Sequence, residues 1–310
     1  MICYDSAMKQ PVKHVVSVSL GSPSRDIDQQ INLLGQDIHL ERRGCDSNLN
    51  KAAKLIREID GKVDAIGLGG IDLYISTGDK HYQFRQAAYL AKQAKITPVV
   101  CGAGLKQSLE SYVIQNLAKG LNLPQQRVLL VSAVDRFGMA KALVEAGADC
   151  RFADLMFALK LPITISSLKN VATLGAALLP ILTQLPISWL YPTGEKQTSE
   201  KKALPKFIEK AYDWATVIAG DWHFIRRYSP KDLSGKIILT NTTTSQDIEF
   251  LRSKGAKSLI TTTPRFNGRS LATNLLEAAL IAVSERYPLN HEDYLTLIQK
   301  ADLKGDILHF

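Results

Sequence analysis

Cysteine is scarce and scattered in this chain. Its 310 residues include four cysteines, Cys3, Cys45, Cys101 and Cys150, and no C-x-x-C pair. This spacing argues against a zinc motif and against a disulfide framework, so we expect a protein of a reducing cytoplasm. No second histidine or cysteine stands at ligand spacing along the sequence, and we predict no bound metal.

Long hydrophobic runs are also missing. Residues 1–11 have no apolar core, which argues against a signal peptide. The most apolar stretch, residues 171–185, is short and contains Gly175, Pro180 and Gln184, as is typical of a buried helix. We therefore expect a cytoplasmic protein with no membrane partner.

The remaining composition is that of an ordinary globular chain, with 45% hydrophobic and 22% charged residues. The net charge of +8 comes from scattered Lys and Arg residues, which favours a small anionic metabolite over nucleic acid as the partner. The sequence leaves a homo-oligomer open. The length suits two domains, and the Gly-, Asn- and Pro-containing segment 119–126 suggests the boundary. We predict a substrate domain at 1–124 and a dinucleotide-binding domain with C-terminal helices at 125–310.

Short apolar segments alternate with small-residue turns and helical patterns along the whole chain. This alternation predicts an α/β protein with two parallel-sheet α/β domains, the second Rossmann-like. After the first strand, we expect the turn at 21–26 to lead into a helix that ends at Leu34. The expected strands are 14–20, 38–42, 64–75, 97–101, 128–131, 150–153, 162–166, 187–191, 216–219, 236–239 and 257–260.

Residues 127–154 read as one βαβ unit, and Asp154 stands where a carboxylate accepts ribose hydroxyls in dinucleotide-binding folds. The preceding loop keeps only one glycine of the G-x-G-x-x-G fingerprint, and Asp135 would repel a pyrophosphate. An alternative is that Asp135 and Asp154 are solvated carboxylates in a layer without a ligand. The first reading predicts NAD or NADP, with NAD preferred. Its cofactor-binding residues would be Ser132, Ala133, Arg136, Phe137, Gly138, Asp154, Thr193, Gly220, Asp221 and Thr242.

Two segments combine arginine with a predicted helix start, where backbone N–H groups attract anions. In the first, Ser22 and Arg25 follow the first strand, although a Ser/Asp helix cap explains that pattern equally well. In the second, Arg265, Asn267 and Arg269 precede a helix predicted over 271–286.

Asp72 and Lys106 follow the third and fourth strands through glycine turns, so both should emerge at the carboxyl edge of the first sheet. A lysine oriented by a carboxylate is a candidate base for a metal-free dehydrogenase, and we predict this pair as catalytic. The alternative is that Asp72 caps a turn and Lys106 is solvated. His223 is a further candidate acid, although a lone loop histidine is more often just solvated.

Motifs across nearly the whole chain resemble bacterial proteins catalogued as quinate 5-dehydrogenase-like: HVVSVSLGSPSRD, DAIGLGGIDLYI, TPVVCGAGLK, VSAVDRFGMAKAL and TTTPRFNGRSLATNLLEA. More distantly, the layout is similar to shikimate and quinate dehydrogenases, which the chain departs from in its loop SAVDRFG and in lacking an Asn-Val-Thr-x-Pro-x-Lys motif. The resemblance implies an NAD(P)-dependent oxidoreductase acting on a small polyhydroxylated or carboxylated metabolite. Two alternatives remain open: a non-catalytic small-molecule or nucleotide sensor of the same fold, and a phosphosugar- or nucleotide-processing enzyme.

Overall fold

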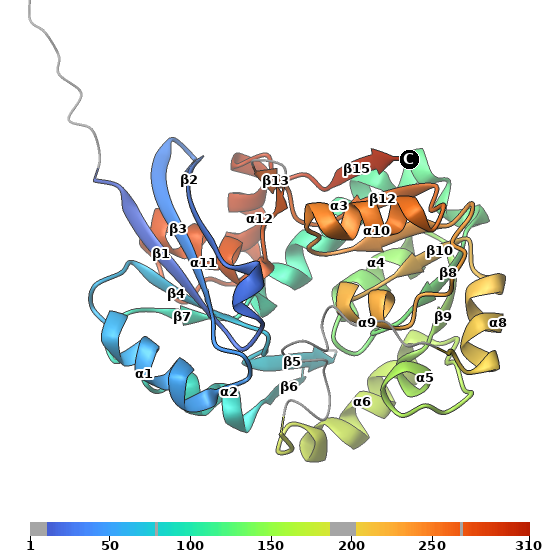
Figure 1. Ribbon diagram of the computed structural model, residues 1–310, viewed down its shortest axis with the longest axis horizontal. Helices are drawn as coiled ribbons and strands as arrows, with labels where there is room; N and C mark the ends of the chain where they lie inside the picture. The colour runs from blue at the N-terminus through green and yellow to red at the C-terminus, as the bar shows by residue number, and fades with distance from the viewer. Residues whose placement is uncertain (1–10, 78–79, 187–202, 267–268) are drawn as a thin grey trace, which may run out of the picture.

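Two parallel-rich sheets stand side by side in the computed structural model (Figure 1). The structure describes residues 11–77, 80–186, 203–266 and 269–310. The predicted α/β class with two parallel-sheet domains is confirmed.

The first sheet has the strand order β2-β3-β1-β4-β7, in which only β2 is antiparallel to its neighbour. Valines 15, 16 and 18 are almost fully buried, as expected for a β-branched strand with both faces covered. The strands are β1 (Lys13–Ser19), β2 (Ile27–Leu33), β3 (Gln36–Gly44), β4 (Ala65–Gly69) and β7 (Val99–Val100).

The helix predicted to end at Leu34 is wrong. The 3-10 turn η1 (Pro23–Arg25) is followed by strand β2, which forms a hairpin with β3. The hydrophobic residues Ile27, Ile31 and Leu33 lie an even number of residues apart, which is the strand period. Leu34 and Gly35 have φ values of 55° and 82° and make the two-residue turn that such a hairpin requires.

The second sheet has the order β15-β12-β11-β10-β8-β9, in which only the edge strand β15 is antiparallel. The βαβ unit predicted over residues 127–154 is confirmed as β8, α4 and β9, at the edge of this sheet opposite β15. The predicted strand 162–166 is reduced to a bridge between Ile165 and Phe152, and the predicted strand 187–191 lies outside the described residues. The strands are β8 (Arg127–Leu130), β9 (Asp149–Phe152), β10 (Val217–Ala219), β11 (Ile237–Thr240), β12 (Ser258–Thr261) and β15 (Asp306–His309).

Both sheets are doubly wound in the same way. Numbered in chain order, the parallel strands run 2-1-3-4 across the first sheet and 2-1-3-4-5 across the second. The order reverses between β1 and β4 in one sheet and between β8 and β10 in the other. Ligands of such sheets bind beyond the carboxyl ends of the strands at this switch point.

Helices cover both sheets, and the C-terminal pair α11 and α12 returns to the first one (Figure 1). Leu275 and Leu276 of α11 belong to the same buried cluster as Val15 and Leu40 of the first sheet. The domain boundary at 124/125 stays a prediction, but the core of the first half includes residues from the end of the chain. The helices are α1 (Leu49–Ile59), α2 (Arg85–Ala91), α3 (Ala103–Leu121), α4 (Phe137–Glu145), α5 (Asp154–Ala158), α6 (Leu168–Leu182), α8 (Lys206–Trp214), α9 (Trp222–Arg227), α10 (Ser245–Ser253), α11 (Thr273–Ser284) and α12 (His291–Lys300).

Two glycines let the start of α11 approach the first sheet closely. A Cβ on Gly67 of β4 would lie 2.8 Å from the Asn274 carbonyl oxygen, and one on Gly102 would lie 2.8 Å from the Asn274 nitrogen. Gly102 also has a φ of 91°, which favours glycine. Three short elements complete the fold: the hairpin β5 (Tyr74–Thr77) and β6 (Lys80–Gln83), the hairpin β13 (Arg265–Phe266) and β14 (Arg269–Ser270), and the 3-10 turn η2 (Leu123–Gln125).

Candidate functional site

A cavity of about 160 Å³ lies between the two sheets, at both switch points. On one side it is lined by Ser19 at the end of β1 and by Gly69 and Gly70 at the end of β4. On the other side it is lined by Asp135, which follows β8, and Asp221, which follows β10. The carboxyl edges of both sheets therefore contribute to one site.

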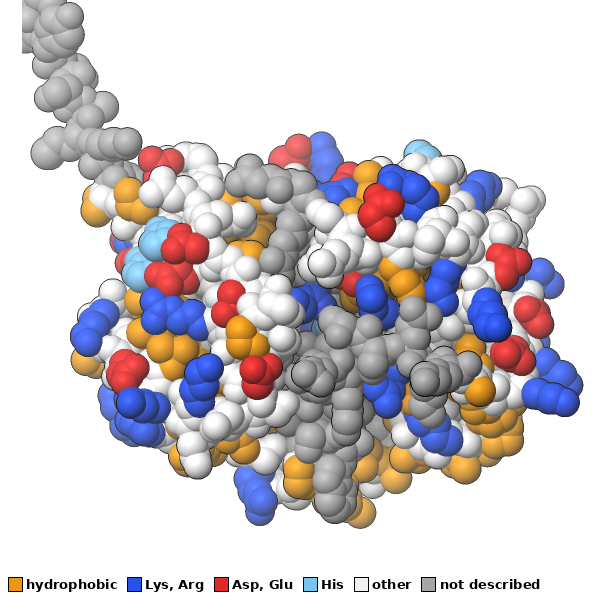
Figure 2. Space-filling view, viewed as in Figure 1, with side chains coloured by type: hydrophobic (Ala, Val, Ile, Leu, Met, Phe, Trp, Pro, Cys, Tyr) orange, Lys and Arg blue, Asp and Glu red, His pale blue; other side chains and the backbone are white. Residues whose placement is uncertain are grey.

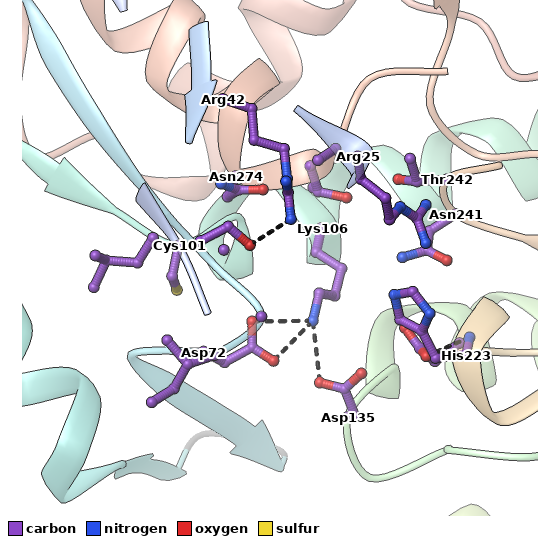
Figure 3. A pocket seen from close by; sticks show the side chains of 18 of the residues that line it. Arg25, Arg42, Asp72, Cys101, Lys106, Asp135, His223, Asn241, Thr242 and Asn274 are labelled. Carbon is purple, nitrogen blue, oxygen red and sulfur yellow. Dashed lines mark hydrogen bonds and ion pairs between the residues drawn. The ribbon is translucent and has the colours of Figure 1, made fainter. Parts of the chain in front are cut away.

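Lys106 stands between two carboxylates at one end of this cavity (Figure 3). Its Nζ lies 3.3 Å from Asp72 Oδ2 and 3.0 Å from Asp135 Oδ1. Lys106 belongs to the first turn of α3, Asp72 follows β4, and Asp135 follows β8, so the cluster joins both halves. The predicted convergence of Asp72 and Lys106 is confirmed, while their catalytic role is not tested by this geometry.

The two carboxylates of this cluster have opposite pKa shifts. Burial raises the pKa of Asp72 to about 7; Lys106 opposes the shift and Asp135 adds to it. For Asp135 burial acts in the same direction, but Lys106 and Arg136 outweigh it and hold the pKa at about 2. Burial works to lower the pKa of Lys106, but the two carboxylates outweigh it and raise the pKa, so the lysine is an ammonium group. Near neutral pH, Lys106 is therefore protonated, Asp135 is ionised, and Asp72 exchanges a proton.

Arg136 lies next to this cluster, with its Nε 3.8 Å from Asp135 Oδ2 and only 2% of its side chain exposed. It pairs with Glu110 of α3, and its Nη2 lies 3.3 Å from Asp221 Oδ2. Asp221 in turn accepts the His223 backbone N–H, and its own backbone N–H donates to Ser132 Oγ. These contacts fix the loops after β8 and β10 against α3.

Two further arginines, Arg25 and Arg42, line the other end of the cavity (Figure 3). Arg42 of β3 donates from Nη2 to Ser19 Oγ at 2.9 Å and from Nη1 to Asp26 Oδ1 at 2.6 Å. Arg25 of η1 has its Nη2 4.0 Å from Asp247 Oδ2. Burial lowers the pKa of both arginines against the opposing effect of nearby aspartates. This end of the cavity presents two partly desolvated guanidinium groups, and a neighbouring aspartate offsets part of the charge of each.

Amide and hydroxyl side chains line the cavity beside the two arginines (Figure 3). Asn274 of α11 donates to Ser17 Oγ at 2.6 Å, and Thr242 donates to the Leu271 carbonyl at 3.2 Å. Asn241 accepts the Trp222 backbone N–H at 3.3 Å. The start of α11, with its N-terminal dipole, also faces the cavity through Thr273 and Asn274.

The structure gives Asp154 a role inside the protein. Its Oδ1 accepts the Val134 backbone N–H at 2.8 Å, and its Oδ2 is buried. Burial raises its pKa to about 6, against the backbone hydrogen bonds from residues 133 and 134. This carboxylate holds the loop after β8 through the Val134 backbone N–H, and it is absent from the lining of the cavity between the sheets.

The other predicted cofactor residues are divided between the cavity and the core. Arg136, Asp221 and Thr242 line the cavity, Ser132 and Ala133 are buried, and Phe137 begins α4. At Gly138 a Cβ would lie 2.8 Å from the Gln107 carbonyl, and at Gly220 one would lie 2.8 Å from Val131. Both glycines therefore allow close packing of the chain on itself. Thr193 lies outside the described residues.

Of the predicted anion-binding residues, one lines the cavity and others lie elsewhere in the protein. Arg25 lines the cavity, whereas Ser22 caps η1 by accepting the Ser24 N–H. Arg265 on β13 lies with its Nε 3.4 Å from Asp306 Oδ2 of the C-terminal strand β15, away from the cavity. Arg269 is on β14, and α11 begins only at Thr273. Asn267 lies outside the described residues.

Several cavity residues were not predicted, among them Ser19, Arg42, Asn241 and Asn274. Arg42 and Asn241 stand at or just beyond the ends of predicted strands, which is a usable signal. Asn274 carried no such signal, because its helix reaches the cavity only through tertiary packing.

The described part of the chain contains no helix both long and apolar enough to cross a bilayer. Its three cysteines, Cys45, Cys101 and Cys150, are buried and unpaired.

The comparisons with known proteins give a family and a set of solved structures. A family model described as "Domain of unknown function (DUF8754)" matches residues 104–310, and one described as "Domain of unknown function (DUF8753)" matches residues 14–101. No curated protein matches the chain.

Several solved structures are similar over most of the chain. An arabinose-binding protein from Geobacillus stearothermophilus is 10% identical, with 96% of this chain and 97% of that one covered and a TM-score of 0.41. An ABC-transporter solute-binding protein from Burkholderia multivorans is 11% identical, with 96% and 99% covered and a TM-score of 0.37. An NAD-dependent malic enzyme from Thermotoga maritima is 13% identical, with 93% and 84% covered and a TM-score of 0.33.

These findings correct two predictions. The resemblance to quinate 5-dehydrogenase-like proteins is wrong, because the family models that match the chain describe domains of unknown function. The prediction of an NAD(P)-dependent oxidoreductase is wrong for the same reason. Residues that were predicted to bind the dinucleotide make contacts within the protein instead. Asp154 accepts the Val134 backbone N–H, and Arg136 in the loop after β8 pairs with Glu110.

Proposed function

The chain belongs to the DUF8754 family, and we propose that it binds a small, hydroxyl-bearing anion in the cavity between its two sheets without converting it. The observation that carries this proposal is the position of one cavity at the switch points of both sheets. The side chains at its two ends differ in charge and chemistry.

The volume limits the ligand. A cavity of about 150 Å³ holds a benzene-sized molecule, so the 160 Å³ here suits a single ring or a short chain with its substituents. A dinucleotide is several times larger. The size therefore favours a small metabolite.

The arginine end supports an anionic group on the ligand. Arg25 and Arg42 place two guanidinium groups at this end, and the N-terminus of α11 adds N–H groups with a positive dipole. Guanidinium groups bind carboxylate and phosphate through paired hydrogen bonds. Because both side chains are only about a tenth exposed, with 11% and 10% in Arg25 and Arg42, their charge is weakly screened.

The lysine end supports hydroxyl groups on the same ligand. Asp72 and Asp135 accept hydrogen bonds from hydroxyls, and the Lys106 ammonium group donates one. The charges of this cluster nearly balance one another, so a second anionic group on the ligand would gain little there. The expected ligand is a hydroxycarboxylate or a sugar phosphate in which the anion faces the arginines.

Thermal-shift and calorimetric titration of the full chain test this proposal. The panel contains hydroxycarboxylates, sugar phosphates and neutral sugars of equal size. A compound that binds only the folded state at 100 times its Kd stabilises it by about 2.7 kcal/mol. We expect the anionic compounds to bind and their neutral counterparts to bind at least about tenfold more weakly. NAD and NADP in the same assay test the predicted cofactor, and the cavity volume predicts that neither binds.

A pair of arginine variants makes this test specific. Arg25→Met should weaken the best binder about tenfold or more, since a charge-assisted hydrogen bond is worth about 1.5 to 3 kcal/mol. Arg252→Met is the matched control, because Arg252 is 55% exposed on α10 and is absent from the cavity lining. Equal losses in both variants, or no binder in the panel, would refute the proposal.

A further inference from the structure

Two histidines meet on the first sheet, at the opposite end of β1 from the cavity. His14 of β1 and His39 of β3 are direct partners in the parallel register, so their side chains share one face. Their rings stack with centroids 4.8 Å apart and an interplanar angle of 10°. Glu41 lies on the same face, because it follows His39 by two residues on the same strand.

Metal-ligating atoms of these three side chains converge. One donor atom each from His14, His39 and Glu41 lies within 4.8 Å of the others. His14 Nε2 is 2.6 Å from Glu41 Oε1, and His39 Nε2 is 2.8 Å from Asp28 Oδ1 on the neighbouring strand β2. Figure 2 shows histidine and acidic side chains gathered on the exposed surface of the first half.

We propose that His14, His39 and Glu41 form a binding site for a divalent transition metal, with Asp28 as the fourth ligand. Two imidazoles and two carboxylates are a donor set that suits Zn²⁺. Tetrahedral Zn²⁺ with bonds of about 2.0 to 2.2 Å separates its ligand atoms by roughly 3.3 to 3.6 Å. The rings must tilt out of their parallel stack to reach this geometry, and 33% and 32% exposure of the His14 and His39 side chains leaves room for it.

The surroundings of Glu41 favour this role. Its Oε2 accepts hydrogen bonds from Arg43 Nε at 2.9 Å and Nη2 at 2.6 Å, which leaves Oε1 directed at the histidines. Such a partner orients a metal-ligating carboxylate and is part of most metal sites. Glu41 and Asp28 together carry two negative charges against the one positive charge of Arg43. The net charge of these three side chains is therefore negative, which favours the binding of a cation.

The sequence-based prediction of no metal depended on spacing along the chain. His14 and His39 are 25 positions apart, and the hairpin β2–β3 between them brings them into register. A bound ion would connect β1, β2 and β3 at the edge of the first sheet, and it would stabilise the folded state in proportion to its affinity.

Isothermal titration of the tag-free, chelator-treated full chain with ZnCl₂ alone tests the proposal. We expect one ion per chain, a raised melting temperature and, with CoCl₂ as a second probe, the visible absorption of Co²⁺ bound by nitrogen and oxygen. The double variant His14→Ala/His39→Ala should weaken Zn²⁺ binding by at least about tenfold. His81→Ala is the matched control, since His81 is exposed on the β5–β6 hairpin.

The variant Glu41→Gln separates metal binding from folding. It keeps a hydrogen-bonding group of the same shape beside His14 but removes the ligating charge, so Zn²⁺ affinity should fall while the melting temperature without metal changes little. Wild-type affinity for Zn²⁺ in either His14→Ala/His39→Ala or Glu41→Gln, or the absence of any stoichiometric binding by the wild-type chain, would overturn the proposal.

Discussion

Asp72 and Asp135 both pair with the Lys106 ammonium group, and the raised pKa of Asp72 makes the stability of the fold depend on pH. The folded-state pKa of Asp72, about 7, is above its ordinary value of 3.8. The folded chain therefore holds a proton on Asp72 that the unfolded chain releases between about pH 4 and 7. The contribution of this residue to stability is full below that range and is lost as the pH rises through it.

The variant Asp72→Asn cannot ionise at this position, so it should not lose folding stability as the pH rises from about 4 to 7. We expect the variant to melt at a higher temperature than the wild type at pH 8 and to differ less from it at pH 5. A gain of about 1 kcal/mol corresponds to about 2 °C in a protein of this size. Differential scanning fluorimetry at the two pH values measures the effect, with Asp213→Asn on the exposed surface of α8 as the control. A variant that is less stable than wild type at pH 8 would show that the carboxylate form is the favoured one.

Single residues also show what the sequence could and could not predict of the site. Asp72 and Lys106 were found because both follow predicted parallel strands, whose carboxyl ends share one edge. The ion pair of Arg265 could not be predicted, because Asp306 lies on a strand from the end of the chain. The hydrogen bond of Asp154 could not be predicted, because its sequence position is the same whether its carboxylate faces a ligand or a backbone N–H of its own loop.

At the scale of elements, helix α11 couples the first sheet to the cavity. Its first turn rests on Gly67 and Gly102, and the same turn lines the cavity through Thr273 and Asn274. A side chain at either glycine would displace the helix start and the cavity wall together.

Gly67→Ala should therefore lower both the stability and the ligand affinity. The added methyl would lie 2.8 Å from the Asn274 carbonyl oxygen, and such overpacking costs about 1 to 3 kcal/mol. Chemical denaturation measures this loss. The control is Gly120→Ala in α3, where nothing lies within 4 Å of the new Cβ and alanine should stabilise the helix by about 0.5 to 1 kcal/mol. Equal stability of the two variants would contradict the tight contact.

The elements themselves were largely predictable, because buried parallel strands are short apolar runs and the helices between them carry apolar residues at helical spacing. Strand β2 was missed because its two-residue period includes Gln29 on the inner face. A polar residue at that position hides the alternation that would have identified the strand.

At the scale of the whole molecule, the hydrophobic core of the first half includes residues of α11 and α12, near the end of the chain. Val15, Leu40 and Leu105 share one buried cluster with Leu275 and Tyr294. The local sequence does not predict that α11 and α12 pack on the first sheet. An amphipathic helix has a recognisable apolar face, but its sequence does not show which sheet covers that face.

A fragment of residues 1–124 should therefore fail to fold alone, although it contains every strand of the first sheet. Circular dichroism and hydrogen exchange should show no cooperative unfolding transition, since the apolar face that α11 and α12 cover would be exposed. Addition of a peptide of residues 270–310 should restore protection at β1 and β3. A cooperative melt of the fragment by itself would mean that α11 and α12 are dispensable for the first core.

The return of α11 and α12 also sets an order of events during synthesis. A ribosome adds about 5 to 20 residues per second, so the roughly 180 residues between the end of α3 and the end of α12 take about 10 to 40 s to appear. During that interval the first sheet has emerged with one apolar face uncovered, while the second sheet can already assemble β8 to β12. The half of the protein that is translated first is thus completed only near the end of synthesis, shortly before β15 completes the second sheet, and its uncovered face is a binding surface for chaperones until the final helices arrive.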